Sequence, residues 1–429
     1  MTAHPFRTTL LSCVAFLAGA CATATGPSSE EDIVSSEEVV VETEEMSPSR
    51  AMHERAIVMD THLDTPANLV LPGFDIMERH DPALDYSQVD LPRMVEGGLD
   101  GGFWVIYTPQ GPLATEAYEA VRDTAILRSL AIHKMVAANP DYFEIATKST
   151  DAARIEGEGK RIVYQSIENA YPLGEDLSLL KTFYRLGVRM VGPVHFANNQ
   201  FGDSATDPEG PDNDGLSALG FELVKEANRL GILLDGSHAH DLTVYDMMEA
   251  SKTPIILSHS GARNVFDHPR NVDDALLLKL KETGGVIQMN ALGAYLKVLQ
   301  TQPAKRAAIM KLRKEMGDVD QMTEEDYQTY LETRRAIDAE FPSDMADFDD
   351  YMEHFIHVLD LIGPDHVGVG ADWDGGGGVV GMQDIAAFPL ITERLIDAGY
   401  AEEDIKKIWG GNVIRLLGEA EEYAASLKE

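Results

Sequence analysis

The sequence of 429 residues has few cysteines and few basic residues. Its two cysteines can build neither a disulfide framework nor a thiolate zinc site, so any metal must be held by His, Asp and Glu. Lys and Arg number 35 against 72 Asp and Glu, and the net charge of −37 repels phosphate backbones and argues against nucleic acid as a partner. Hydrophobic residues (44%) and charged residues (25%) are otherwise typical of a soluble globular chain.

Residues 1–20 have the features of an export signal. Arg7 precedes an uncharged apolar run, Leu10–Ala20, which is too short to span a bilayer comfortably. The residues that end at Cys21 resemble a bacterial lipoprotein signal, in which the cysteine is lipidated and becomes the new N-terminus. We therefore predict an exported protein of the bacterial cell envelope whose only membrane contact is a lipid anchor on Cys21. The alternative is ordinary cleavage after one of the following alanines, which gives a periplasmic or secreted product.

Residues 21–50 are predicted to form an acidic, disordered tether. The part between residues 26 and 48 has no Lys or Arg and cannot bury enough apolar area to fold alone. A specific acidic docking tail is the alternative interpretation. The carboxylates of this segment are Glu30, Glu31, Asp32, Glu37, Glu38, Glu42, Glu44 and Glu45.

The remaining residues, 51–429, alternate between short apolar runs and helical patterns, and we assign them to one domain. Continuous apolar strands separated by helices favour a parallel sheet that is covered on both faces. Eight such runs predict an α/β fold of the TIM type, a (β/α)8 barrel. Residues 300–345 are charged and helix-rich without a strand, and we interpret them as a helical insertion near the barrel mouth. The eight runs are Ala56–Met59, Gly102–Tyr107, Ile162–Ile167, Met190–Val194, Ile232–Leu234, Pro254–Leu257, Val286–Met289 and His366–Val369.

Histidines and carboxylates follow six of these eight runs. Barrel enzymes place their chemistry at the carboxyl ends of the strands, because those ends converge on one mouth. The residues that follow the runs are Asp60-Thr61-His62-Leu63-Asp64, Glu168-Asn169, His195, Asp235-Gly236-Ser237-His238, Ser258-His259-Ser260 and Asp372-Trp373-Asp374.

Five of these side chains have the spacing of a two-metal site. His62 and Asp64 are two residues apart, so on an extended segment they point the same way and can bind one ion. His238 and His259 end neighbouring strands and can bind a second ion, and Glu168 can bridge the two. Such ligands suit zinc, with manganese or cobalt as substitutes. Each residue alone has a structural alternative, such as Asp64 capping the next helix, but the set of five predicts a metal centre.

Three further residues suggest roles in catalysis and binding. His195 could donate to the oxyanion that develops on a substrate carbonyl, and Asp372 could transfer a proton to the leaving amine. Arg270 is the nearest cation able to hold a substrate carboxylate bidentately. Its alternative is a surface arginine that pairs with Asp273 or Asp274.

The sequence resembles the membrane (renal) dipeptidase family of zinc metallopeptidases from about Asp60 to Leu417. Beyond the strand-end motifs above, the resemblance rests on the following segments: Ile167-Glu168-Asn169-Ala170, Gly187-Val188-Arg189, Gly215-Leu216-Ser217, Ser258-His259-Ser260-Gly261-Ala262-Arg263, His268-Pro269-Arg270-Asn271-Val272, His366-Val367-Gly368-Val369-Gly370-Ala371-Asp372-Trp373-Asp374-Gly375 and Gly410-Gly411-Asn412.

The resemblance implies a metal-dependent hydrolase with two zinc ions per subunit. It implies that one ion is bound by His62 and Asp64, the other by His238 and His259, and that Glu168 bridges them. It further implies that His195 contacts the substrate carbonyl oxygen, Asp372 handles the proton and Arg270 holds the C-terminal carboxylate. Members of the family often accept a D-residue at the C-terminal position of the dipeptide and are often homodimers.

We therefore expect an exported dipeptidase that uses a metal-bridging hydroxide to hydrolyse free dipeptides. Two alternatives remain at this point. One is another amidohydrolase activity on the same metals, such as that of a lactonase, lactamase or deaminase. The other is a surface-anchored lipoprotein that binds dipeptides without cleaving them.

Overall fold

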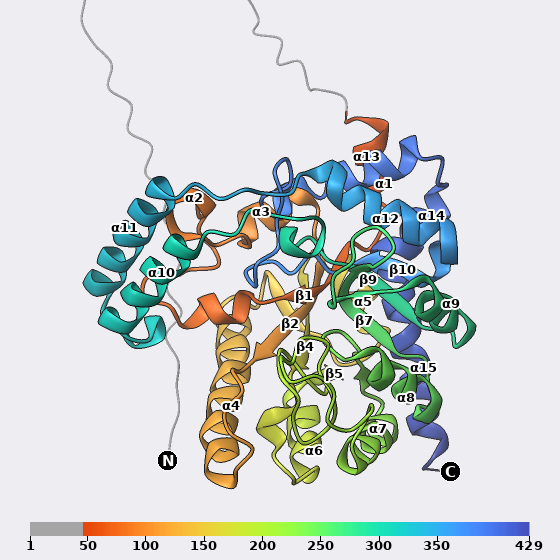
Figure 1. Cartoon of the computed structure of the whole chain (residues 1–429). Helices are drawn as coiled ribbons and strands as arrows, with labels where there is room; N and C mark the ends of the chain where they lie inside the picture. The colour runs from red at the N-terminus through yellow and green to blue at the C-terminus, as the bar shows by residue number, and fades with distance from the viewer. Residues whose placement is uncertain (1–45, 429) are drawn as a thin grey trace, which may run out of the picture. The chain divides into compact units, whose positions relative to one another are not determined.

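The computed structural model describes residues 46–428 (Figure 1). The predicted signal, Cys21 and most of the predicted tether therefore lie outside the described residues. Ser47 caps the first helix, α1 (Pro48–His53), so the last residues of the predicted tether range are helical. Between residues 46 and 428, no helix combines the length and apolar character that crossing a membrane requires.

The strands form a closed parallel barrel. Five of them run in the order β1-β2-β4-β5-β6 and three more in the order β10-β9-β7, while β3 and β8 add to β4 and β7. Parallel bridges join the two sheets at both junctions, Asp235 with Ile256 and Leu63 with Trp373. The predicted (β/α)8 architecture is confirmed. The strands are β1 (Met59–Leu63), β2 (Gly101–Tyr107), β3 (Phe143–Ile145), β4 (Arg161–Glu168), β5 (Val188–Val191), β6 (Leu233–Leu234), β7 (Ile256–Ala262), β8 (Asn271–Val272), β9 (Val286–Met289) and β10 (Val367–Val369).

Two predicted strands are displaced toward their carboxyl ends. The sequence placed the first strand at 56–59 and the sixth at 254–257, whereas β1 and β7 run through the motifs that were expected to follow them. All residues of both strands are buried. The polar residues continue the strands because they face other polar groups inside the mouth, and an apolar run therefore ends before its strand does.

An apolar plug closes the barrel below this polar mouth. Seven strands contribute eight hydrophobic residues to the cluster, two of them from β4, and residues of α15 (Asn412–Ser426) cover it from below. The functional groups therefore rest on a packed floor that holds the strand ends in place. The strand residues of the plug are Met59, Phe103, Ile162, Tyr164, Met190, Leu233, Ile256 and Val286.

Helices surround the strands (Figure 1). For example, α4 packs against β2, α6 against β5, and α7 against β6. A π-helical turn at Lys407–Gly411 joins α14 to α15. The other helices are α2 (Pro82–Asp85), α3 (Leu91–Gly97), α4 (Thr115–Ala138), α5 (Asp151–Gly157), α6 (Ser178–Leu186), α7 (Ala218–Leu230), α8 (Asp241–Ala250), α9 (Asp274–Glu282), α10 (Pro303–Met316), α11 (Glu324–Glu340), α12 (Phe348–Ile362), α13 (Pro389–Asp397) and α14 (Glu402–Lys406).

The helical insertion lies on the mouth face of the barrel. Its helices α10 and α11 pack side by side in the connection between β9 and α12. This connection starts at the carboxyl end of β9. The insertion is also tied to the loop that follows β1, because Tyr86 donates a hydrogen bond to Asp338 (2.6 Å) and Arg335 donates one to the carbonyl of Leu84 (2.6 Å).

Candidate metal centre and active site

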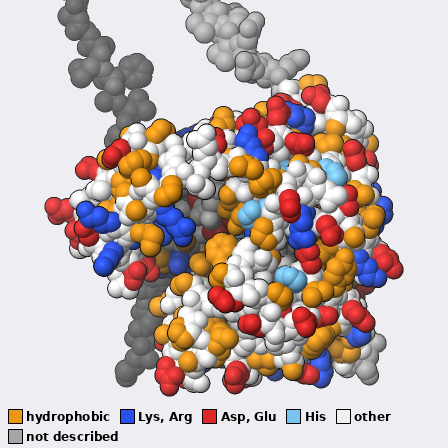
Figure 2. All heavy atoms as spheres, viewed as in Figure 1, with side chains coloured by type: hydrophobic (Ala, Val, Ile, Leu, Met, Phe, Trp, Pro, Cys, Tyr) orange, Lys and Arg blue, Asp and Glu red, His pale blue; other side chains and the backbone are white. Residues whose placement is uncertain are grey.

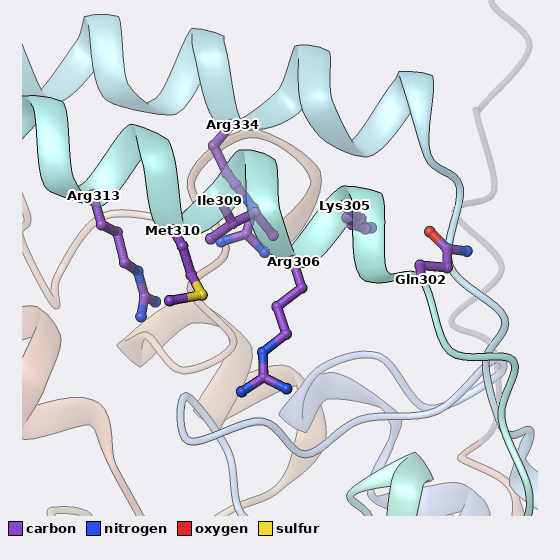
Figure 3. A pocket seen from close by; sticks show the side chains of 7 residues that line it. All are labelled: Gln302, Lys305, Arg306, Ile309, Met310, Arg313 and Arg334. Carbon is purple, nitrogen blue, oxygen red and sulfur yellow. The ribbon is translucent and has the colours of Figure 1, made fainter.

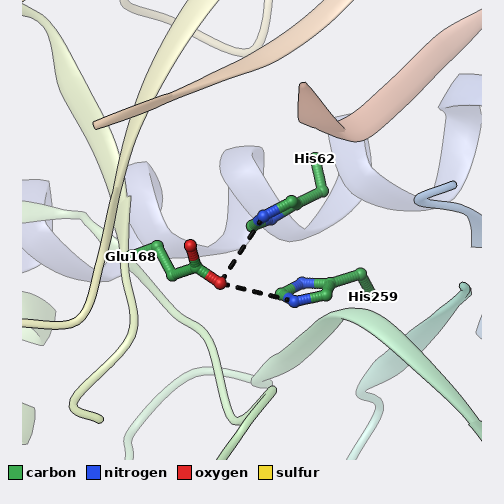
Figure 4. A group of neighbouring side chains, drawn as sticks. All are labelled: His62, Glu168 and His259. Atoms are coloured by element: carbon green, nitrogen blue, oxygen red, sulfur yellow. Dashed lines mark ion pairs between the residues drawn. The ribbon is translucent and has the colours of Figure 1, made fainter. Parts of the chain in front are cut away.

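The structure brings the five predicted ligands into one pocket around Glu168. Oxygen Oε1 of Glu168 lies 3.0 Å from Nε2 of His238, 3.4 Å from Nε2 of His259 and 3.6 Å from Nε2 of His62. Figure 4 shows this carboxylate facing His62 and His259. Asp64 completes the set, with Oδ2 at 3.5 Å from Nε2 of His62. Oε1 of Glu168 therefore lies within 3.6 Å of an imidazole nitrogen from each predicted pair.

The local backbone explains how these side chains are aimed. His62 and His259 lie on strands β1 and β7, and Glu168 is the last residue of β4. His238 and Asp372, just beyond β6 and β10, both have a φ of +68°, a conformation that non-glycine residues rarely adopt. Strain of this kind is concentrated at functional sites, where the surrounding structure holds it.

The pocket has the properties that a pair of divalent ions requires. Both ring nitrogens of His62 and Nδ1 of His238 are buried and lack hydrogen-bond partners among the described residues. Nε2 of His238 and Nε2 of His259 lie only 2.9 Å apart, so they aim at the same space. Unpaired buried nitrogens are costly unless a ligand satisfies them. The donor set of imidazoles and carboxylates suits zinc, manganese or cobalt.

The electrostatics of the pocket also favour the binding of cations. Burial raises the pKa of Glu168 to about 8, and the charges of Asp64 and Asp372 act in the same direction. Burial opposes the charged form of His62, but the Glu168 and Asp64 carboxylates outweigh it and raise the pKa of His62 to about 10. Burial lowers the pKa of His238 and of His259 well below the usual value, which keeps these imidazoles in the neutral form that binds metals.

A hydrogen-bond relay fixes the orientation of His259. The hydroxyl of Ser258 donates to Oδ2 of Asp235 (2.6 Å) and lies 2.8 Å from Nδ1 of His259. Since the carboxylate only accepts, the hydroxyl must accept from Nδ1–H, which leaves the lone pair of Nε2 facing Glu168. Asp235 and Ser258 were quoted in the sequence motifs without a role, because the spacing of a motif does not show which atoms face each other.

We expect Ser258→Ala to lower the metal affinity of the site about 10- to 100-fold, the usual cost of losing such a supporting hydrogen bond. The measurement is metal retention during titration with a chelator. Ser260→Ala is the matched control, because Ser260 is an equally buried neighbour of His259 that bonds to Ser237 (3.2 Å) instead. Equal metal affinity in the Ser258 variant and the wild type would contradict the relay.

Asp372 lies on the His62 side of the pocket. A ligand atom of Asp372 lies within 4.8 Å of ligand atoms of His62 and Asp64. Asn290 donates to Oδ2 of Asp372 (3.4 Å). Gly375 permits this arrangement, because a Cβ there would collide with the carboxylate oxygens of both Asp64 and Asp372. The run of glycines after β10 thus has a steric role that its sequence alone did not indicate.

His195 and Arg270 face the same pocket. Nε2 of His195 lies 3.7 Å from Oε1 of Glu168, and burial lowers the pKa of His195 to about 3, so its ring is neutral. Arg270 is 3% exposed and donates from one terminal nitrogen to the carbonyl of His259 (3.0 Å), while its Nε has no partner among the described residues. The alternative pairing with Asp273 or Asp274 is absent, because Asp273 caps α9 and Asp274 pairs with a histidine.

Asp64 does not cap the helical turn that follows it, which was the alternative to metal binding. Asp64 precedes the 3-10 turn Thr65–Val70, but its side chain makes no capping hydrogen bond there. Its carboxylate instead turns toward His62 and Asp372.

Aromatic side chains complete the walls of the pocket and were not predicted. The ring centroids of Tyr107 and Phe196 lie 4.8 and 3.9 Å from that of His195, and the guanidinium carbon of Arg270 lies 5.3 Å from the ring centroid of Tyr295. Phe196 remains 52% exposed beside these polar groups. Phe196 directly follows His195 in the sequence, and this position could have indicated it. Tyr295, in contrast, is remote from every motif that was considered.

Comparisons with known proteins identify the family of this chain. Residues 46–429 match the family model described as membrane dipeptidase, peptidase family M19. Dipeptidase tcpJ of Claviceps purpurea is 32% identical over 362 residues, which cover 83% of this chain and 75% of the relative. Dipeptidase aclJ of Aspergillus oryzae is 31% identical over 350 residues, with 80% and 72% covered.

Solved structures give the same result. The probable dipeptidase PvdM of Pseudomonas aeruginosa superposes with a TM-score of 0.73 at 29% identity, and the match covers 87% of this chain and 98% of PvdM. A metallopeptidase of Rhodobacter sphaeroides, crystallised with a phosphinate mimic of L-Ala-D-Ala, gives 0.67 at 26% identity, with 85% and 99% covered. The chain described here therefore belongs to the membrane dipeptidase family of metallopeptidases and is a hydrolase that acts on dipeptides.

Proposed function

We propose that this protein is an exported zinc dipeptidase that binds two Zn²⁺ per subunit and hydrolyses free dipeptides, including those with a D-residue at the C-terminal position. The observation that carries the proposal is the position of one Glu168 oxygen within 3.6 Å of the imidazole nitrogens of His62, His238 and His259. A carboxylate at that point can bridge two ions.

We assign the residues around Glu168 to two ligand sets. His62 and Asp64 would hold one ion, and His238 and His259 the other. When bound, such a pair lowers the pKa of a shared water and polarises the carbonyl of the scissile bond. Manganese or cobalt could replace zinc in the same donor set.

The protein's own groups then bind and orient the dipeptide. The unpartnered guanidinium nitrogens of Arg270 would hold the C-terminal carboxylate. His195, neutral because burial lowers its pKa to about 3, would donate one N–H to the carbonyl oxygen as negative charge develops there. Asp372 would take up a proton and deliver it to the departing amine.

The choice of free dipeptides follows from the fixed position of Arg270. Arg270 donates to the carbonyl of His259 (3.0 Å), a predicted metal ligand, so a carboxylate bound by Arg270 would lie near the scissile bond. The Rhodobacter sphaeroides relative, crystallised with a mimic of L-Ala-D-Ala, supports acceptance of a D-residue at that position.

The cellular context is proposed from the sequence. The charged-then-apolar leader supports export, and Cys21 is the proposed lipid attachment site in the bacterial cell envelope. Labelled palmitate should enter the wild-type protein and not a Cys21→Ala variant. A homodimer is proposed from the family resemblance, and light scattering of the purified protein measures it.

A stereochemically complete dipeptide library, assayed with the zinc-loaded protein, tests the proposed reaction. We expect turnover of L,L and L,D dipeptides, with lactones and acylated amino acids cleaved far more slowly. Faster turnover of a lactone or an acylated amino acid than of every dipeptide would favour another amidohydrolase activity. Binding of dipeptides without cleavage would favour a non-catalytic receptor.

Dipeptide amides serve as the matched substrates in this assay, because they lack the carboxylate that Arg270 is proposed to bind. In Arg270→Ala, KM for free dipeptides should rise about 10- to 100-fold, the effect of losing a charge-assisted hydrogen bond. KM for the amides should change little. An equal effect on both substrates would contradict the assigned role of Arg270.

A further inference from the structure

The insertion carries a basic pocket on a strongly acidic protein. The pocket has a volume of about 540 Å³ and is lined by four cations and no carboxylate. Figure 3 shows that these side chains come from α10 and from the neighbouring α11, and Figure 2 shows basic side chains on the insertion beside a hollow. The lining residues are Gln302, Lys305, Arg306, Ile309, Met310, Arg313 and Arg334.

Two of the four cations have no partner within the described part of the chain. Lys305 and Arg334 share the carboxylate of Asp338, at 2.7 and 3.3 Å. The side chains of Arg306 and Arg313 form neither an ion pair nor a hydrogen bond there, although acidic residues outnumber basic ones two to one. Arg270, the proposed carboxylate-binding residue, is likewise kept free of acidic partners. An arginine that stays unpaired in so acidic a protein is available to an anionic ligand.

An apolar side chain lies between the two free arginines. Arg306, Met310 and Arg313 are spaced four and three residues apart, so they form one stripe along α10. The two arginines are about 10 Å apart along the helix axis, and their flexible side chains can converge on one ligand. Met310 is 62% exposed, and an exposed methionine is an adaptable contact for apolar groups.

We propose that this pocket is a second binding site, for a small organic anion with an apolar body. Arg306 and Arg313 bind the anionic group, a phosphate or a carboxylate, and Met310 with Ile309 contacts the apolar part. The site lies on the mouth face of the barrel, because the insertion leaves the carboxyl end of β9. The anionic group has two possible sources, an acidic substrate or a separate small molecule.

Calorimetric titration of the zinc-loaded protein with phenyl phosphate tests the site. Arg306→Ala/Arg313→Ala should weaken binding at least about tenfold, because charge-assisted hydrogen bonds are lost. Met310→Ala should weaken the binding of phenyl phosphate and leave the binding of inorganic phosphate unchanged. Arg185→Ala is the control, since Arg185 is an exposed arginine of α6 whose side chain has no ion pair or hydrogen bond in the described structure. An unchanged Kd in the double variant, or no saturable binding to the wild type, would overturn the proposal.

Kinetics with two dipeptides distinguish the sources. If the anion belongs to the substrate, the double variant raises KM for L-Ala-L-Glu and leaves KM for L-Ala-L-Ala unchanged. If it is a separate molecule, both KM values stay unchanged while phenyl phosphate binding is still lost. Binding at the metal centre is followed separately, as competitive inhibition of L-Ala-L-Ala hydrolysis. The calorimetric result does not depend on turnover, so it stands or falls independently of the proposed reaction.

Discussion

Replacing Asp372 with Asn is expected to leave the metal content unchanged and to lower kcat about 10²- to 10⁴-fold, the usual contribution of a positioned acid–base group. Asn has nearly the same shape as Asp but cannot take up the proton that the leaving amine needs. Burial and the charge of Asp64 raise the pKa of Asp372 to about 6, which suits a group that must both accept and release a proton. The measurement is kcat together with metal analysis of the same preparation.

Asp374→Asn is the matched control for this variant. Burial raises the pKa of Asp374 to about 6 as well, but its oxygens accept hydrogen bonds from Thr65 and from the backbone of Gln88, both at 2.7 Å. Both oxygens of this carboxylate are therefore occupied in tying two loops together. A near wild-type kcat in Asp372→Asn, or an equal loss in both variants, would contradict the proposed proton transfer.

Replacing Glu168 with Ala is expected to remove bound zinc from both positions and to abolish turnover. One oxygen of this carboxylate serves both ligand pairs, so no other side chain can supply a bridge at that point. Without it, each ion would have two protein donors instead of three. These donors would be His238 and His259 at one position, and His62 and Asp64 at the other. Zinc per chain, measured after dialysis, should fall from two to near zero.

Asp100→Asn is the control for the removal of a partly buried carboxylate that lies away from the site; this one pairs with Arg161. Burial also raises the pKa of Asp100, to about 6, but Asp100 lies at the amino end of β2 and accepts a hydrogen bond from the backbone of Val58. This variant should keep both zinc ions. Two zinc ions per chain in Glu168→Ala would reject the bridging role.

The barrel could be predicted because parallel strands that are buried on both faces leave continuous apolar runs in the sequence. The strand ends could not be predicted as well. His62 and His259 lie within β1 and β7, because their side chains face the other polar groups of the mouth, and this arrangement is visible only in three dimensions. The two-residue strand β8 and the π-helical turn at Lys407–Gly411 also have no distinct sequence signal.

The gathering of the ligands could be predicted from the convergence of strand ends, whereas their supporting contacts could not. Ser258 links Asp235 to His259 by hydrogen bonds. Gly375 has no side chain and so leaves space for two carboxylates. Both depend on which atoms face each other across the barrel. The assignment of individual ligands to each ion stays a prediction.

Anomalous diffraction at the zinc edge, from crystals of the zinc-loaded protein, is the most direct test of the proposed metal centre. We predict two peaks about 3.5–4 Å apart, one on the His62 and Asp64 side of Glu168 and the other on the His238 and His259 side. A single peak, or two peaks that do not share the Glu168 carboxylate, would contradict it.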